Sequence, residues 1–182
     1  GRSLSEDTVT IIQGYLGMEH HVGALIGGAL DMVHRRPERR NLHLAWGMEE
    51  LKHAEACELV LLHSGRRTEE ELEAYRDAVL PRYTALREEN PALETPLGVA
   101  CYALLQERAA FFNYEELRGR IRREYGLPEG LTEPERERGI EIGAAGAFKL
   151  VANDELAHHR VFLELVRIYL RYLPQDTLAA LQ

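Results

Sequence analysis

The chain has 182 residues, two cysteines and a formal net charge of −8 at pH 7. This length fits a single domain, residues 1–182, with a substantial core, and the acidic balance argues against nucleic acid as a partner. No apolar run of about 18 residues and no signal-peptide pattern occurs, so we expect a cytoplasmic protein that is not an integral membrane protein. Cys57 and Cys101 are isolated, which argues against structural zinc or a disulfide framework and predicts two buried thiols.

The first half of the chain predicts two long helices. Apolar residues recur at helical spacing, and β-branched runs of alternating polarity are absent, so we predict an all-α protein. The first helix is expected over residues 3–34, from a capping box that begins at Ser3 to a stop at Pro37. The second is expected over residues 38–63, because the Ser-Gly pair that follows is a common C-terminal signal.

A long connection separates these helices from the next pair. Thr68 begins a second capping-box pattern, which predicts a shorter helix that reaches Leu80 and ends before Pro81. From there to Glu94 we expect irregular or briefly helical chain. A connection of roughly 30 residues can travel the full length of a helical bundle, whereas short links join antiparallel neighbours.

The second half predicts two more long helices. Thr95 and the proline after it favour a helix start, and this third long helix is expected over residues 96–125. A capping box at Thr132 predicts the start of the fourth, over residues 133–173, which Pro174 ends before a short last helix. Four long helices with one long crossover between the second and third describe a ferritin-like four-helix bundle.

Arginine is clustered at three places, in residues 35–40, 66–67 and 118–123. Cations suit the carbonyl groups at helix C-termini, so solvated helix ends would explain these clusters. The alternative is a docking surface for an acidic partner. In the predicted bundle, the second and third clusters lie at one end and the first lies at the other.

Two Glu-x-x-His pairs and two single glutamates lie on the four predicted long helices. Residues i and i+3 of a helix point to the same side, so each pair can hold one metal ion through an oxygen and a nitrogen. This ligand set is that of the di-iron and di-manganese carboxylate proteins with ferritin-like bundles. The candidate ligands are Glu19, Glu50, His53, Glu107, Glu155 and His158.

Either Glu-x-x-His motif alone could arise by chance on a helix surface. The faces that carry these glutamates are otherwise apolar, however, and they lack the lysines or arginines that salt bridges would require. Burying an unpartnered glutamate is costly, and metal coordination removes that cost. Oxygen and nitrogen ligands without thiolate favour iron, with manganese as the alternative. Glu49 and Asp154 each precede the glutamate of a pair, and we expect them to accept hydrogen bonds from the ligand histidines.

Three segments resemble the soluble acyl-ACP desaturases. WGMEELKHAEACELVLLHSGR is similar to the segment in which a tryptophan precedes an EENRH-like motif, and LLQERAAFFNYEEL resembles the Q-E-R-A-T-F segment of that family. NDELAHHRVFLELVRIYLRYLPQDTLAAL resembles the DEKRHE helix and the turn after it. The likeness extends over roughly residues 40–80 and 95–182 and is weakest in the first helix.

The resemblance implies a di-iron enzyme that uses O2 and two electrons, usually from a ferredoxin-type donor, to introduce a double bond into an acyl chain on acyl carrier protein. It also implies that the six candidate ligands bind iron, that Trp46 lies near the metals, and that the protein forms a homodimer. Acyl carrier protein is acidic, which suits the arginine clusters.

Two departures from the family pattern keep other functions open. The desaturases usually carry a threonine three residues after the third-helix glutamate, where this chain has Ala110, and the chain has little sequence beyond the bundle. One alternative is another di-iron oxidase or oxygenase that acts on a small substrate. The other is a metal-binding or iron-handling protein with no organic substrate.

Overall fold

The computed structural model describes residues 3–88 and 90–182; for residues 23–24, 83–88 and 91–92 it describes the backbone alone. Throughout these described ranges the secondary structure is helical, which confirms the all-α prediction. None of the described helices combines the length and the apolar character that crossing a membrane requires. In chain order the elements are α1 (Glu6–Val33), α2 (Pro37–His63), α3 (Glu69–Glu88), the 3-10 turn η1 (Pro91–Glu94), α4 (Pro96–Tyr125), α5 (Glu133–Arg138), α6 (Gly143–Tyr172) and α7 (Pro174–Ala180).

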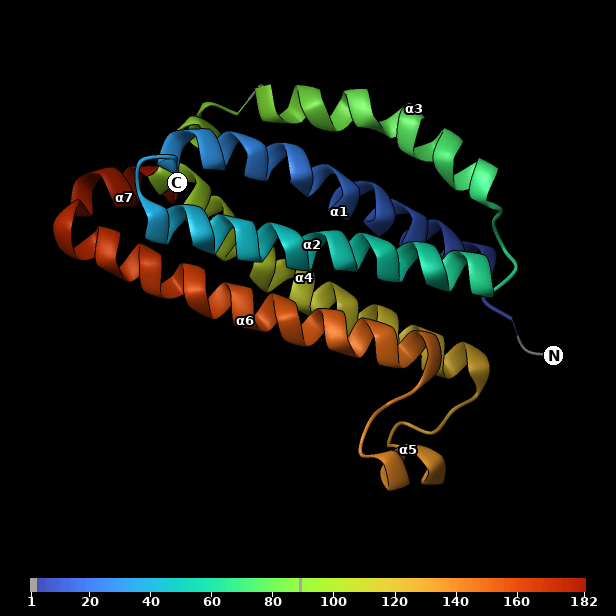
Figure 1. Ribbon diagram of the computed structural model, residues 1–182. Coiled ribbons are helices and arrows are strands. Elements are labelled where there is room, and N and C mark those ends of the chain that lie inside the picture. Colours follow the sequence, from blue (N-terminus) through green and yellow to red (C-terminus); the bar gives the residue numbers. More distant parts are fainter. Residues whose placement is uncertain (1–2, 89) are drawn as a thin grey trace.

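Four long helices, α1, α2, α4 and α6, lie side by side (Figure 1). The closest neighbours are α1 with α2 and α4 with α6, and each of these pairs is antiparallel. Helix α3 runs back along the outer side of α1, so that the chain returns from the end of α2 to the beginning of α4. Consequently α2 and α4 run in the same direction, as the predicted long connection requires.

Side-chain caps fix several helix starts. The N–H of Thr68 donates to Glu71, and the N–H of Glu71 donates back to the Thr68 hydroxyl, which confirms the capping box of α3. The Thr95 hydroxyl accepts from Gly98 N–H at the start of α4. At α1 the expected cap was wrong, because Ser5 rather than Ser3 precedes the helix and accepts a hydrogen bond from Thr8 N–H.

Helix α3 does not stop at Pro81, as predicted, but continues through it to Glu88. A proline inside a helix deprives the carbonyl four residues earlier of its N–H partner. Here that carbonyl belongs to Asp77, and both Asp77 and Pro81 are exposed on the outer side of the molecule. Water can therefore hydrogen-bond the freed carbonyl, which lowers the cost of continuing the helix.

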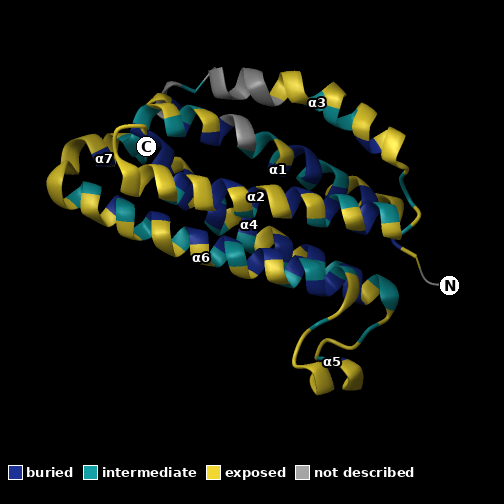
Figure 2. Ribbon diagram, in the orientation of Figure 1, coloured by how far each residue is buried: buried dark blue, intermediate teal, exposed yellow. Residues whose placement is uncertain are grey.

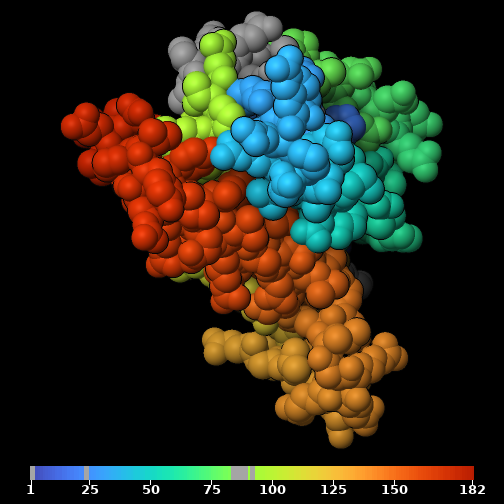
Figure 3. All heavy atoms as spheres, turned by 60° about the vertical axis from the view of Figure 1, so that its left-hand side comes forward, coloured from blue at the N-terminus to red at the C-terminus, as the bar shows by residue number. Residues whose placement is uncertain are grey.

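The capping box at Thr132 opens a short helix, α5, instead of the last long helix. Gly139 has φ of 68°, a left-handed conformation that ends α5. The chain then turns at Gly143, which has the same φ, into α6. The segment that carries α5 projects from the body of the molecule (Figure 3). The prediction of one continuous helix over residues 133–173 was therefore wrong, because its first ten residues belong to this projection.

One buried arginine of α4 holds this projection in place. The Arg122 guanidinium donates to the carbonyl oxygens of Pro128 and Gly130, at 3.0 and 2.6 Å, and to the carboxylates of Glu135 and Glu141. All three charged side chains are almost completely buried. The guanidinium therefore binds two carboxylates and two turn carbonyls at once, and Arg118 adds a second positive charge beside Glu141.

The core consists of two apolar clusters with a polar layer between them. One cluster includes Leu16, Ala54 and Ala152, and the other includes Trp46 and Phe162. Dark-blue buried residues run along the inner sides of all four long helices, and yellow exposed residues cover their outer sides (Figure 2). The boundary between the two clusters falls at the level of the candidate ligands on every long helix.

We expect Arg122→Met to lower the free energy of unfolding by about 3 kcal/mol, because it leaves the buried Glu135 carboxylate without its cationic partner, whereas Glu141 still pairs with Arg118. Arg123→Met is the matched control, since Arg123 is mostly exposed and pairs with an exposed glutamate, and it should cost less than about 1 kcal/mol. Urea denaturation measures both. Equal effects of the two substitutions would contradict the role assigned to Arg122.

Candidate metal centre

All six candidate ligands are buried in the polar layer, and each long helix contributes to it. Helix α1 brings one glutamate, α4 brings one, and α2 and α6 each bring a glutamate and a histidine from successive turns. Each of the six residues is at most 6% exposed. They are Glu19, Glu50, His53, Glu107, Glu155 and His158.

The six side chains form two overlapping groups. In each group, one ligand atom from every member lies within 4.8 Å of the others. The first group contains Glu19 and His53, the second contains Glu107 and His158, and Glu50 and Glu155 belong to both. Each group could hold one metal ion, and the two candidate positions would share two glutamates and have one glutamate–histidine pair each.

Both histidines turn Nδ1 toward the cluster and Nε2 away from it. His158 Nδ1 lies 3.0 Å from Glu50 and 3.1 Å from Glu107, while its Nε2 lies 2.7 Å from the Glu49 carboxylate. His53 Nδ1 lies 3.2 Å from Glu155. An outer carboxylate that accepts the Nε2 proton leaves Nδ1 free to bind a metal ion.

Each outer carboxylate contacts the histidine of the other Glu-x-x-His motif. Glu49, which precedes Glu50, accepts a hydrogen bond from His158 on α6, as the symmetry of the motifs predicts. Asp154, which precedes Glu155, lies 3.5 Å from His53 Nε2 on α2. This distance marks an ion-pair contact rather than a short hydrogen bond. Both carboxylates are roughly half-exposed, so solvent reaches the outer side of the site between α2 and α6.

Burial and mutual repulsion make this cluster hold protons when no metal is bound. Burial raises the pKa of Glu19, Glu107 and Glu155, in the case of Glu155 to about 9. Burial opposes a charge on His53 as well, but the carboxylates of Glu155 and Glu50 raise its pKa to about 10. These directions reflect a dense set of acidic groups in a site with little water.

Several buried atoms of the cluster make ion-pair contacts with one another but form no hydrogen bond of good geometry. They include Glu50 Oε1, Glu155 Oε1 and His53 Nδ1. Leaving such atoms without a hydrogen bond in a protein interior is costly. Coordination of a metal ion would engage all three, and carboxylate and imidazole donors are the ligands that iron and manganese accept. The residues present therefore fit the implied metal pair.

Glu19 belongs only to the first group and Glu107 only to the second, and each accepts a hydrogen bond from an aromatic residue. The Tyr114 hydroxyl donates to Glu19, and Trp46 Nε1 donates to Glu107 Oε1 at 3.1 Å. Trp46 therefore lies beside the candidate ligands, whereas its nearness to a metal ion stays a prediction. Tyr114 was not predicted, although it follows Glu107 by seven residues and therefore lies on the same face of α4.

Ala110 and the cysteines also lie where the sequence indicated. Ala110 is buried within the first apolar cluster, so this turn of α4 offers no hydroxyl to the site. Cys57 and Cys101 are both buried and free, which confirms the prediction of two buried thiols. Burial raises the pKa of the Cys57 thiol, which keeps it protonated.

A cavity of about 330 Å³ reaches the cluster from the side of α1, η1 and α4. Its apolar lining includes Met18, Val22, Leu25 and Leu93. Among the described lining residues the carboxylates are Glu19, Glu50, Glu107 and Glu155, all of them candidate ligands. A small molecule in this cavity would therefore meet both ion positions.

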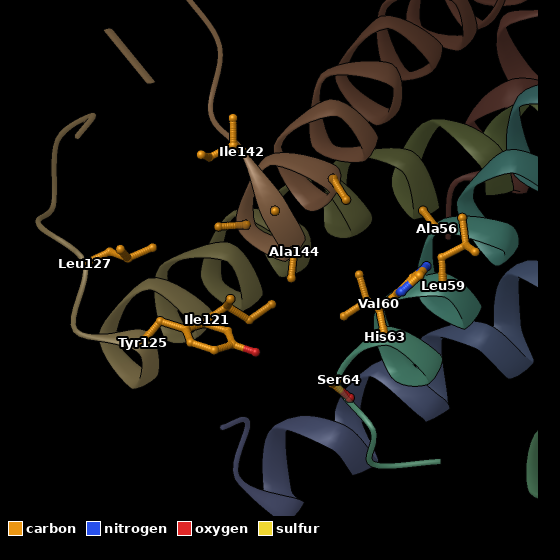
Figure 4. A pocket seen from close by; sticks show the side chains of 13 residues that line it. Ala56, Leu59, Val60, His63, Ser64, Ile121, Tyr125, Leu127, Ile142 and Ala144 are labelled. Carbon is orange, nitrogen blue, oxygen red and sulfur yellow. The ribbon is translucent and has the colours of Figure 1, made fainter. Parts of the chain in front are cut away.

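A larger cavity, of about 860 Å³, lies between the end of α2, the end of α4 and the beginning of α6. Figure 4 shows Val60, Ile121 and Ala144 around it, with His63 and Ser64 at one side. None of the six candidate ligands lines it. Its mostly apolar walls include Val60 and Ile121 of the first apolar cluster.

Comparison of the chain with protein-family models, curated proteins and solved structures gives no match.

Metal binding should release protons and strengthen as pH rises from about 6 to about 9. The raised pKa values mean that His53, His158 and Glu155 are protonated at neutral pH in the metal-free protein, whereas metal ligands must be deprotonated. Calorimetric titration with Mn(II) in buffers of different ionisation enthalpy measures the proton count, for which we expect at least three per chain. An affinity independent of pH would contradict this.

The shared and unshared ligands should differ in their effect on stoichiometry. We expect two ions per chain in the unaltered protein, about one in His53→Gln, and none retained at the same metal concentration in Glu155→Gln, because Glu155 belongs to both groups. Elemental analysis after gel filtration measures the ratio. Equal loss of metal in the two variants would argue against two overlapping positions.

Proposed function

We propose that the chain is a ferritin-like four-helix bundle related to the soluble acyl-ACP desaturases. In this proposal it is a di-iron oxidoreductase that uses O2 to introduce a double bond into an acyl chain carried on acyl carrier protein. A ferredoxin-type protein would supply the electrons, and the protein would act as a homodimer. The observation that carries the proposal is the convergence of four glutamates and two histidines into two groups that share Glu50 and Glu155.

Bound and reduced, the metal pair would supply O2 activation and the oxidising power for removing hydrogen from a C–H bond. The six ligand residues would hold the two ions side by side. Glu49 orients His158, and Trp46 and Tyr114 orient Glu107 and Glu19. The apolar clusters on both sides exclude water from the layer in which the reaction takes place.

The cavity beside the ligands favours an organic substrate over iron handling. An iron-transport path would need carboxylates that pass the ion inward, whereas the described lining residues contribute no carboxylate beyond the four ligands. The remaining walls are largely apolar, and they suit the methylene groups of a substrate. Iron storage or transport is therefore less well supported than oxidation of a C–H bond.

A di-iron oxidase or oxygenase with a small substrate is the second candidate. Two observations favour it. The cavity at the ligands, at about 330 Å³, is at the small end of the range for ligand pockets. In addition, Ala110 gives the site no hydroxyl at the position where the desaturases usually have threonine.

The arginine clusters differ in how far their charge is already neutralised. At the end of the molecule where α2 and α4 terminate, Arg66 and Arg67 pair with Glu6, and Arg122 is enclosed by carboxylates. At the opposite end, the arginines at the α1–α2 turn are exposed and lie within 4.0 Å of no carboxylate in the described part of the chain. An acidic carrier protein would therefore dock at Arg35, Arg36, Arg39 and Arg40.

The direct test of activity uses protein loaded with Fe(II), ferredoxin, its reductase and acyl-ACPs of several chain lengths. We expect mass spectra to show a product lighter by two hydrogens, and the Glu155→Gln variant to yield none. If protein that holds two ions leaves every acyl chain unchanged, desaturation is excluded. Oxygen consumption with small substrates would then favour the second candidate.

Docking at the α1–α2 turn predicts a selective effect of charge removal. Arg36→Gln with Arg40→Gln should weaken acyl carrier protein binding roughly tenfold at low salt, because two charge contacts of about 0.7 kcal/mol each are lost. Arg136→Gln with Arg138→Gln, on α5 at the opposite end, is the matched control and should change binding less than about twofold. Similar losses in both variants would indicate nonspecific attraction.

A further inference from the structure

We infer that Tyr114 and Trp46 are positioning residues that act on different metal positions. Tyr114 holds Glu19 for the position that contains His53, and Trp46 holds Glu107 for the position that contains His158. The inference rests on the proposed metal pair. It predicts that the two positions can be weakened one at a time by changing residues that do not bind metal.

The two unshared glutamates need an external anchor more than the shared ones do. Glu50 and Glu155 each lie within a turn of a ligand histidine on the same helix, at positions i and i+3. Glu19 and Glu107 are the single ligands of α1 and α4. A glutamate side chain has three rotatable bonds, so a carboxylate without a fixed neighbour can turn away from the site.

Each unshared carboxylate has one oxygen held by an aromatic donor. Glu107 shows the consequence most clearly, because Trp46 Nε1 binds its Oε1 while its Oε2 lies 3.1 Å from His158 Nδ1, inside the cluster. Glu19 Oε1 is held in the same way by the Tyr114 hydroxyl. Fixing one oxygen orients the carboxylate and leaves the other oxygen for a metal ion.

Both donors are themselves immobilised by packing. The Tyr114 ring is fully buried and stacks on Phe148 with an interplanar angle of 14° and a centroid distance of 5.8 Å. The Trp46 ring is buried and meets Phe162 edge-on at 4.9 Å. A donor that cannot change its rotamer transmits its fixed position to the carboxylate that it binds.

The two hydrogen bonds also link different helices. Tyr114 reaches from α4 to Glu19 on α1, and Trp46 reaches from α2 to Glu107 on α4. Three of the ligand-bearing helices, α1, α2 and α4, are thereby joined at the polar layer by contacts that involve no metal ion. Removing one contact frees one carboxylate and leaves the other bond unchanged.

Single-position backgrounds make the test selective, with Co(II) as the probe because its visible absorption reports ligand geometry. His158→Gln leaves the position of Glu19 and His53, and His53→Gln leaves the other. Tyr114→Phe should weaken Co(II) binding about 10–100-fold in the His158→Gln background and change its spectrum. In the His53→Gln background it should change affinity less than about twofold. Trp46→Phe should show the reverse pattern.

Tyr15→Phe is the matched control, because the Tyr15 ring packs 4.9 Å from Tyr114 and loses only a hydroxyl that is not bonded to Glu19. It should leave Co(II) binding unchanged in both backgrounds. Thermal unfolding of each metal-free variant establishes that it is folded, and if Tyr114→Phe fails to fold, the Trp46→Phe pattern decides. Equal effects in both backgrounds, or none, would overturn the inference. If the unaltered protein binds no Co(II), the proposed metal pair itself fails.

Discussion

Burying ionisable groups between two apolar clusters is the constraint on which the rest of this structure depends. Four glutamates and two histidines lie in one layer of the core, almost completely shielded from water. Each charge removed from water costs several kcal/mol unless it is paired. Without metal, the cluster meets this cost by retaining protons, as the raised pKa values of Glu19, Glu155 and His53 indicate. Two divalent cations would remove the repulsion and engage the unpaired oxygen and nitrogen atoms.

The same constraint explains how the site is supported. Hydrogen bonds from Tyr114 and Trp46 fix Glu19 and Glu107, whose helices carry no candidate-ligand histidine, and Glu49 fixes His158 from outside. Access to the ligands differs on the two sides. A partly apolar cavity reaches the glutamates from α1 and α4, whereas the half-exposed carboxylates of Glu49 and Asp154 lie between α2 and α6. The candidate ligands can thus be reached from more than one side of the bundle.

Local chemistry made much of the fold predictable. The caps at Thr68 and Thr95 involve residues three positions apart, and Glu-x-x-His pairs share a helix face whatever their surroundings. Two of the wrong predictions, at Pro81 and at Thr132, concern positions where more distant parts of the structure decide the outcome. Pro81 lies inside a helix because exposure lets water bind the carbonyl that the proline leaves free. The capping box at Thr132 opens a short helix because glycine ends it and Arg122 holds the segment apart.

The candidate ligands could be predicted for a similar reason, whereas their supports could not. Each Glu-x-x-His pair is visible within four residues, but Tyr114 and Glu19 are 95 residues apart, and only the packing of α4 against α1 brings them together. The seven-residue spacing from Glu107 was the one sequence signal for Tyr114. It placed the side chain on the correct face of α4 without indicating its partner.

Anomalous diffraction at the iron absorption edge, from crystals of Fe(II)-loaded protein, tests the central claim most directly. The account predicts two iron peaks about 3.5–4 Å apart, both within the layer formed by the six buried side chains, with Glu50 and Glu155 next to both peaks. A single peak, or iron bound only at surface carboxylates, would contradict a two-metal centre and with it the proposed oxidation chemistry.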